Sequence, residues 1–426
     1  MNNSPAHISS STSGLLDKKT AAIVFLTFAA AYILSALVRA IIATLSPVLS
    51  LEFSLQSRDL GLLAGGYFLG FAATQLPLGT WLDRYGPKRV IVCFLAVAVL
   101  GCLVFSSASS FTGLLAGRVL IGMGVSACLM AALTGYRRWF DAPTLLRANS
   151  WMLMTGSLGM LASTLPVQWL IPLTGWRPLF WILAALILLA MAAIAWVVPV
   201  LSHNASPSPF LTRPLLAAAM PAQTAGYGPI WRSRYFRKMA PLAFFNYGGM
   251  VAVQTLWAGP WLLRVTGDSA LQSATGLFCI NASMLLTFWS WGMVNPWLAR
   301  HGWSATRLIA RGVPFSLAVL AFNIAAGSAT GWPGWALFCV TSSVMGLAQP
   351  AVGMSFGASQ AGRALSAYNL VIFAGVFVMQ WGLGLLIDGF AALGLGQVGS
   401  FQAAMAVFLC CCIAAYGYFL SVKADN

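Results

Sequence analysis

Long apolar segments alternate with short polar ones along almost the whole chain. Each apolar segment is close to the length of about 20 residues that a helix needs to cross a bilayer. Twelve such segments cover residues 20–48, 60–82, 89–108, 111–136, 148–173, 178–200, 239–263, 270–298, 307–327, 332–356, 365–390 and 398–421. Only the connection 201–238 is long, and it is rich in Pro, Ser and Ala. The pattern predicts two six-helix bundles, 20–200 and 239–422, joined by that linker and preceded by a disordered cytoplasmic tail at 1–19.

Composition supports a membrane protein. Hydrophobic residues make up 59% of the chain and charged residues 7%, whereas about 25% of a soluble domain is charged. The net charge is +15, but the basic residues lie between apolar segments, so we expect a lipid bilayer as partner and no nucleic acid. The 8 cysteines lie in apolar segments without a C-x-x-C pair. We read them as buried apolar side chains, and we expect no metal and no other cofactor.

Lys and Arg are concentrated in alternate connections between the predicted spans. The positive-inside rule then places both termini and the linker in the cytoplasm. The polar, Ser-rich N-terminus lacks the apolar segment of a signal peptide. We expect a multi-pass monomer in the inner (plasma) membrane.

Two loop segments repeat across the chain. GTWLDRYGPKRV at 79–90 follows the second span, and NPWLARHGWSATR at 295–307 follows the eighth. Trp, Leu, Arg and Gly recur at a constant offset, so the two halves share a common ancestry. Parallel repeats are a known transporter architecture, in which the substrate site lies between the halves near the midplane.

The first copy of the repeat resembles the loop signature of the major facilitator superfamily. It reads Gly79-x-x-x-Asp83-Arg84-x-Gly86-x-Lys88-Arg89, and Arg118-x-x-x-Gly122-x-Gly124 in the fourth span resembles the helix 4 motif of the superfamily. The resemblance implies an all-α membrane protein with twelve transmembrane helices in two pseudo-symmetric bundles. It also implies secondary transport by alternating access, as symport or antiport.

The loop signature suggests a role in gating. Its glycines permit a tight turn, and its acid can pair with a cation or a helix N-terminus across the bundle. The alternative is a solvated, positively charged cytoplasmic loop. The candidate gating residues are Gly79, Asp83, Arg84, Gly86, Lys88 and Arg89.

Ionisable residues inside membrane spans are costly and therefore point to function. Arg39 lies deep in the first span, and Tyr32 and Ser35 share its helix face. We expect this face to line a cavity; the alternative is an arginine that caps carbonyls or extends to the interface. Arg118 in the fourth span either orients a neighbouring helix or binds substrate. Asp388 lies near the outer end of the eleventh span, and no Asp, Glu or His occupies the middle of a span.

The position of Arg39 is similar to that of the helix 1 arginine that binds the anion in organophosphate antiporters of the superfamily. Their second arginine would fall near Ala252 and is absent. A single arginine suits a monoanion such as a carboxylate better than a phosphate dianion.

The second half offers a complementary polar face. Tyr247, Gln254 and Trp257 recur at helical spacing in the seventh span. Further polar candidates for contact with substrate are Tyr67, Asn281, Asn369 and Gln380. Each buried amide needs a hydrogen-bond partner, which is either another helix or the substrate.

These features predict a transporter of a small organic solute that is anionic or amphipathic, with or without a coupled proton. A multidrug or metabolite efflux pump is the first alternative, although the fifth span lacks the Gly-Pro motif of drug–proton antiporters. A copper or other metal importer would use the 16 Met and 8 Cys, but there is no M-x-x-x-M. We expect no enzyme, because no metalloprotease or phosphate-binding motif is present.

Overall fold

The computed structural model describes residues 16–199 and 226–422, and these residues form helices without a strand. The N-terminal half contains α1 (Lys18–Phe53), α2 (Ser57–Tyr85), α3 (Pro87–Ser107), α4 (Phe111–Val125), α5 (Ala127–Trp139), α6 (Ala142–Ala162), α7 (Leu165–Thr174) and α8 (Trp176–Val197). The C-terminal half contains α10 (Gly228–Arg232), α11 (Arg234–Pro241), α12 (Gly248–Ala252), α13 (Ala258–Arg264), α14 (Ala270–Arg300), α15 (Ala305–Ala326), α16 (Trp332–Ser342), α17 (Ala348–Met354), α18 (Ala358–Ala392) and α19 (Gln397–Ser421).

Several of the predicted spans consist of shorter helices stacked end to end. The fourth span is α4 with α5, the fifth is α6 with α7, and the tenth is α16 with α17. The seventh combines α11, α12 and α13 with two π-helical segments, η3 (Leu242–Tyr247) and η4 (Val253–Trp257). Nine helices in the described part of the chain are long and apolar enough to cross a membrane.

Proline explains two of these interruptions. Pro166 has no N–H to donate to the carbonyl of Ala162, where α6 ends. Pro260 likewise cannot donate to the carbonyl of Leu256, which lies in η4. Such π segments occur often at functional sites.

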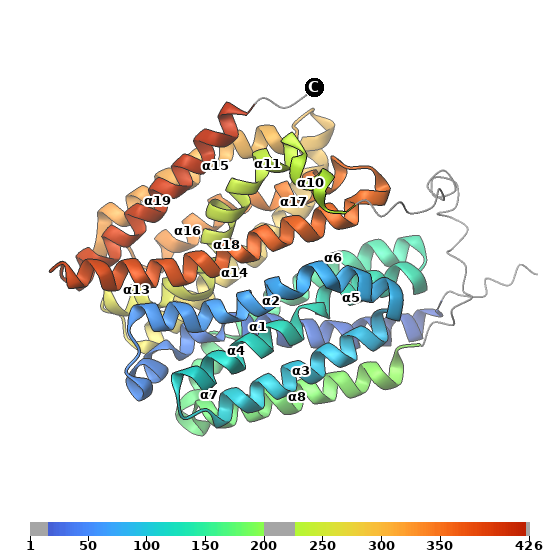
Figure 1. Cartoon of the computed structure of the whole chain (residues 1–426), viewed down its shortest axis with the longest axis horizontal. Helices are drawn as coiled ribbons and strands as arrows, with labels where there is room; N and C mark the ends of the chain where they lie inside the picture. The colour runs from blue at the N-terminus through green and yellow to red at the C-terminus, as the bar shows by residue number, and fades with distance from the viewer. Residues whose placement is uncertain (1–15, 200–225, 423–426) are drawn as a thin grey trace, which may run out of the picture.

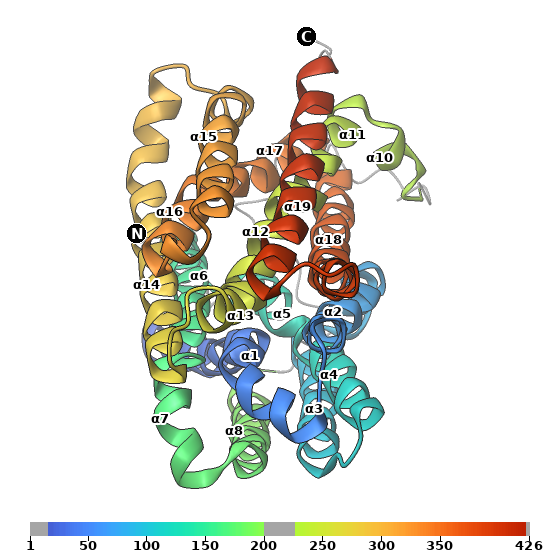
Figure 2. The same ribbon diagram turned by 90° about the vertical axis from the view of Figure 1, so that its left-hand side faces the viewer.

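The two halves pack side by side, as Figure 2 shows from the end that carries residues 54–56 and 393–396. The contacts between them join α2 to α18, α1 to η4 and α13, and α14 to α6 and α7. In Figure 1, α15 and α19 are inclined to the long helices of the N-terminal half, while α18 runs beside α2.

The end of the predicted linker forms two short helices. Residues 200–225 lie outside the described residues, whereas residues 228–232 and 234–241 form α10 and α11 with Ser233 between them. α11 begins at Arg234 because the hydroxyl of Ser233 before it accepts from the backbone N–H of Phe236 at 3.4 Å. In the last turn of α11, the ammonium of Lys238 donates to the carbonyl oxygen of Val422 at 2.7 Å and lies 4.8 Å from the ring centroid of Phe419. The basic side chain is therefore buried against α19 rather than extended into solvent.

Candidate functional site

Arg39 lies on α1 between the two halves of the protein. Its side chain is half-buried, and its Nε is buried without a hydrogen-bond partner among the described residues. The hydroxyl groups of Tyr32 and Tyr67 lie within interaction range of the guanidinium, and the charge of Arg39 also reaches Tyr247 in the C-terminal half. Two tyrosines, from α1 and α2, thus interact with this cation, and a third in the seventh span feels its charge.

The helix face predicted around Arg39 is well packed. Gly156 of α6 makes room for Tyr32, because a Cβ there would lie 2.7 Å from the tyrosine ring. The hydroxyl of Ser35 donates to the carbonyl of Val125 at 3.5 Å, and Tyr67 donates to the carbonyl of Ser35 at 3.4 Å. Ser35 and Tyr67 therefore hold α1 against α4 and α2 next to Arg39.

Arg118 is fully buried on α4. Its Nη1 donates to the carbonyl of Val38 at 2.7 Å, and its guanidinium lies 5.1 Å from the ring centroid of Tyr67. Its Nε and Nη2 have no hydrogen-bond partner among the residues that the structure describes. Because Val38 precedes Arg39, this bond fixes the backbone of α1 next to Arg39, and the choice between the orienting and the substrate-binding role stays a prediction.

The polar candidates of the C-terminal half bond mostly to one another. Gln254 donates to the side-chain oxygen of Asn281 at 2.9 Å, and Asn281 donates to the carbonyl of Leu277 at the same distance. Gln380 donates to the hydroxyl of Thr255 at 2.9 Å, and its backbone carbonyl accepts from the indole of Trp257 at 3.2 Å. These bonds join the π segment η4 to α14 and α18.

Asn369 behaves in the same way, since its side-chain oxygen accepts from Gln349 of α17 at 2.7 Å. The amides predicted as candidates for contact with substrate therefore also act as bonds between helices. Gln380 retains a buried side-chain oxygen that has no partner within the described part of the chain.

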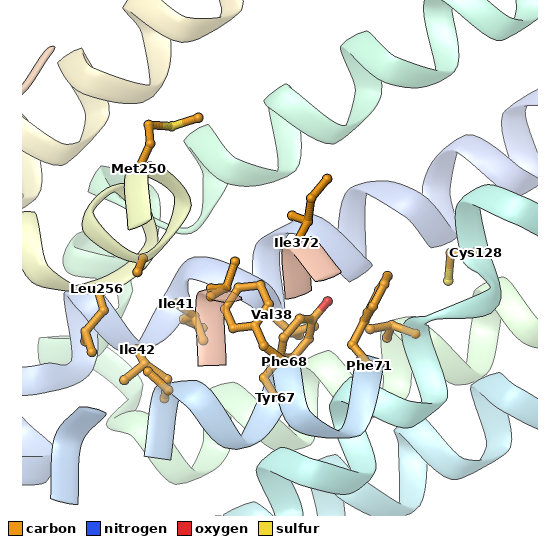
Figure 3. Packing of buried hydrophobic residues seen from close by; sticks show 14 of the residues in the cluster. Val38, Ile41, Ile42, Tyr67, Phe68, Phe71, Cys128, Met250, Leu256 and Ile372 are labelled. Carbon is orange, nitrogen blue, oxygen red and sulfur yellow. The ribbon is translucent and has the colours of Figure 1, made fainter. Parts of the chain in front are cut away.

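Apolar and aromatic side chains fill the surroundings of Tyr67. Figure 3 shows Val38, Ile41, Tyr67, Phe68 and Phe71 gathered between α1 and α2, with Ile372 of α18 close by. The ring centroids of Phe71 and Phe373 are 4.4 Å apart, and the rings of Tyr67 and Phe71 stack at 6.0 Å. Tyr67, which interacts with Arg39, thus belongs to a largely apolar wall that both halves form.

The loop signature forms the turn between α2 and α3. Gly86 has φ 78° and ψ 160°, a backbone conformation that residues other than glycine rarely adopt. A Cβ at Gly79 would meet no atom within 4 Å, and the guanidinium of Arg84 lies 5.3 Å from the ring centroid of Tyr85. Lys88 and Arg89 lie in the first turn of α3, half-buried and exposed respectively. The side chain of Asp83 falls outside the described residues, so its gating role stays a prediction.

Sequence reasoning missed three features, namely the side chain of Gln349, the π segments and the partners of Asp388. Gln349 bonds to Asn369, but neither Gln349 nor the π segments produce a periodic pattern in the sequence. Asp388 was expected near the membrane surface, at the outer end of its span. The structure adds that its carboxylate accepts from the backbone N–H groups of Ser57 and Arg58 at 3.1 and 2.7 Å. Its position near a span end was visible, whereas its partner on a distant helix was not.

The model of the family described as Major Facilitator Superfamily matches residues 28–380. The chain belongs to the Major Facilitator Superfamily. It has the all-α fold that the superfamily shares, with helices long and apolar enough for a multi-pass membrane protein.

Relatives of this superfamily protein have low identity to it. The probable sulfoacetate transporter SauU of Cupriavidus necator is 24% identical over 57% of this chain and 57% of its own length. The 4-hydroxybenzoate transporter PcaK of Acinetobacter baylyi is 24% identical over 58% of this chain and 60% of its own length. The matched segments thus span less than two thirds of these relatives.

The fold of this superfamily protein is similar over nearly its whole length to a solved structure. A bacterial homologue of the human lysosomal transporter Spinster, in an inward-facing and occupied conformation, superimposes with a TM-score of 0.73 at 17% identity. The match covers 95% of this chain and 97% of the Spinster homologue.

Proposed function

We propose that this protein is a secondary transporter of the inner membrane that moves a small organic monoanion with an apolar body by alternating access. The observation that carries the proposal is the cation Arg39, which interacts with the hydroxyls of Tyr32 and Tyr67 and whose buried Nε has no partner among the described residues. An unpaired buried charge is costly, so an anionic ligand would compensate it. A residue between the halves can contact the same ligand in either access state.

The surroundings of Arg39 narrow the substrate class. In the described residues, the second guanidinium at this depth, that of Arg118, is fully buried, and one of its nitrogens bonds to the backbone of α1. We assign the ligand to the half-buried Arg39 alone, which favours a carboxylate or sulfonate monoanion over a dianion. The wall of Phe68, Phe71 and Phe373 favours an apolar or aromatic remainder.

The names of the relatives agree with an organic anion, and one of them agrees with the narrower class. 4-Hydroxybenzoate joins one carboxylate to an aromatic ring, whereas sulfoacetate, with a carboxylate and a sulfonate, is a dianion. A multidrug or metabolite efflux pump remains the alternative function, and it would accept neutral and cationic compounds as well.

Transport into proteoliposomes tests the proposal. Purified protein would be reconstituted and supplied with radiolabelled benzoate, acetate, benzamide and a quaternary ammonium compound. We expect uptake of benzoate well above uptake of benzamide, and little uptake of the cation. Uptake of the cation or the neutral amide at a rate equal to that of benzoate would overturn the assignment to anions.

Arg39→Lys and Arg39→Ala then connect transport to the site. The lysine keeps the charge but loses the planar pair of donors, so it should retain only part of the uptake. The alanine should abolish it. Gln349→Ala, which alters an amide pair elsewhere in the C-terminal half, serves as a control for general damage.

A further inference from the structure

The second copy of the repeated loop, which joins α14 to α15, forms a basic pocket that the proposed transport function does not use. Where the first copy carries Asp83, the second has Ala299, and the sequence contains no acidic residue between Asp268 and Asp388. The pocket has a volume of about 160 Å³ and is lined by His301, Gly302, Trp303, Arg307 and Arg311. Positive charge therefore gathers here without an acid in the same stretch of the chain.

Specific contacts hold both guanidinium groups of the pocket in place. That of Arg311 lies 4.7 Å from the ring centroid of Trp303. Nη1 of Arg307 donates to the carbonyl of Gly302 at 3.3 Å, and the backbone N–H of Arg307 donates to the hydroxyl of Ser304, which caps α15. Neither arginine forms an ion pair within the described part of the chain. Since a guanidinium has five N–H donors, each keeps donors for a ligand.

The pocket lies where the surface of the membrane is expected. The segments Ala270–Asn295 and Ala305–Ala329 are each long and apolar enough to cross a bilayer, and the pocket lies where the first ends and the second begins. Trp297 beside it is 51% exposed, and its ring centroid lies 4.3 Å from that of His301. Tryptophan is enriched at the interface between membrane and water. The pocket is therefore at the level of lipid head groups, on the side that the charge pattern predicts to be cytoplasmic.

One exposed face of α15 changes from basic to apolar along the helix. Its exposed residues follow one another at spacings of three or four, which places them in one line: Arg307, Arg311, Phe315, Ala318 and Phe322. Phe315 and Phe322 are 67% and 68% exposed, so they are free to contact lipid chains. Two cations at the membrane surface thus continue into an apolar face, which matches the head group and the acyl chain of a phospholipid.

The charges of the pocket favour an anionic head group over a zwitterionic one. The two free oxygens of a phosphodiester can accept from planar guanidinium groups. A zwitterionic head group also carries an ammonium, which would need an acid beside the pocket, and residues 269–387 contain none. A soluble phosphate compound would satisfy the arginines but would leave the apolar face of α15 unused. The combination of charge and apolar surface therefore fits an anionic phospholipid.

We propose that this pocket binds the head group of an anionic phospholipid, whose acyl chain lies along Phe315 and Phe322. The phosphodiester accepts from Arg307 and Arg311, and Trp303 keeps the second guanidinium in position. Basic side chains next to a membrane span attract anionic head groups in this way. The inference concerns a lipid site on the rim of the C-terminal half and is independent of the substrate at Arg39.

Native mass spectrometry of the full chain in detergent tests the proposal, because it resolves each bound lipid by its mass. The delipidated protein would be titrated with dioleoyl phosphatidylglycerol, which is anionic, and with dioleoyl phosphatidylcholine, which is zwitterionic. A third titration would use glycerophosphoglycerol, which is the same anionic head group without acyl chains. For the first molecule bound, we expect phosphatidylglycerol to have a higher affinity than either of the other two compounds.

Substitutions then connect the lipid to the pocket. Arg307→Gln combined with Arg311→Gln should weaken the first binding of phosphatidylglycerol by about tenfold, the range for loss of a hydrogen bond to a charged group, and should leave phosphatidylcholine unaffected. Arg311→Lys keeps the charge but loses the planar group against Trp303, so it should lose only part of the affinity. Arg137→Gln with Arg138→Gln is the matched control, because it removes the same charge from two exposed arginines in the last turn of α5. This control should bind phosphatidylglycerol like the parent protein.

Three results would overturn the proposal. The first is equal affinity of the parent protein for phosphatidylglycerol and phosphatidylcholine. The second is an affinity for phosphatidylglycerol that is the same in the parent protein and the Arg307 and Arg311 double variant, or that falls equally in the control at Arg137 and Arg138. The third is binding of glycerophosphoglycerol as tight as that of the lipid, which would assign the pocket to a soluble phosphate compound instead.

Discussion

Gly384→Ala should separate α2 from α18 at their close contact without unfolding either half. The added Cβ would lie 2.4 Å from the carbonyl oxygen of Ser57 and 2.8 Å from Cα of Arg58, whereas ordinary contacts begin at 3.4 Å. The two backbones must therefore separate by about 1 Å at this point. Both neighbours are backbone atoms, so a change of rotamer cannot relieve the overlap.

The size of the effect follows from the cost of overpacking. An added methyl group in a tightly packed place costs about 1–3 kcal/mol. Because Gly384 and Ser57 belong to different halves, the halves can relieve the cost by moving apart. The ratio of closed to open protein should then fall by a factor of about 5 to 150. By contrast, a Cβ added to Gly375 would lie 2.3 Å from the carbonyl oxygen of Phe244 inside one half, so Gly375→Ala should lower the melting temperature instead.

The assay is the distance between spin labels on cysteines that replace Leu51 and Leu393, together with thermal unfolding. These two side chains are 84% and 76% exposed, one in each half. In every variant, serine would replace the accessible native cysteines Cys93, Cys279, Cys410 and Cys411. Gly382→Ala is the matched control. Gly382 lies on the same helix as Gly384, but a Cβ added there meets no atom within 4 Å. It should leave the distances unchanged. If Gly384→Ala and Gly382→Ala give the same distances and the same melting temperature, the reasoning about close packing of α2 and α18 is refuted.

Two further predictions concern the buried polar groups. Arg118→Met should destabilise the protein by about 1.5–3 kcal/mol, because the charged hydrogen bond to the Val38 carbonyl is lost. Unchanged melting temperatures in both Arg118→Met and Arg118→Lys would contradict an orienting role. The Gln254→Leu and Asn281→Leu double-mutant cycle should give a coupling of about 0.6 kcal/mol, and at most about 1.7 kcal/mol. Additive effects in unfolding experiments would show that the amide pair contributes no mutual stabilisation.

The membrane environment explains why the sequence predicts so much of the fold. Backbone groups in lipid must bond within their own helix, so each long apolar segment specifies a helix. The segment at 239–263 shows the limit of this rule. Its apolar residues predicted a span, but the cap at Ser233 starts the helix earlier, at Arg234, and Pro260 lies next to a π segment.

The candidate site was predictable only in part, for a related reason. Helical spacing places Tyr32, Ser35 and Arg39 on one face of one helix, and Tyr32 does lie beside the guanidinium. Spacing within a helix says nothing about partners on distant helices. Two examples are the hydrogen bond from Gln254 to Asn281 and the bond that Asp388 accepts from the start of α2. Both depend on how the helices pack against one another, and the pattern within a single span holds no information about that packing.

Equilibrium binding of a matched acid and amide tests the central claim most directly. Calorimetry would compare benzoate with benzamide on the parent protein, Arg39→Lys and Arg39→Ala, with melting temperatures to confirm folding. Loss of a charge-assisted pair costs about 1.5–3 kcal/mol, or about 10- to 150-fold in affinity. We predict that benzoate binds the parent protein more tightly than benzamide by such a factor and that Arg39→Ala removes the difference. Equal affinities for acid and amide in the parent protein, or unchanged benzoate affinity in folded Arg39→Ala, would contradict the account.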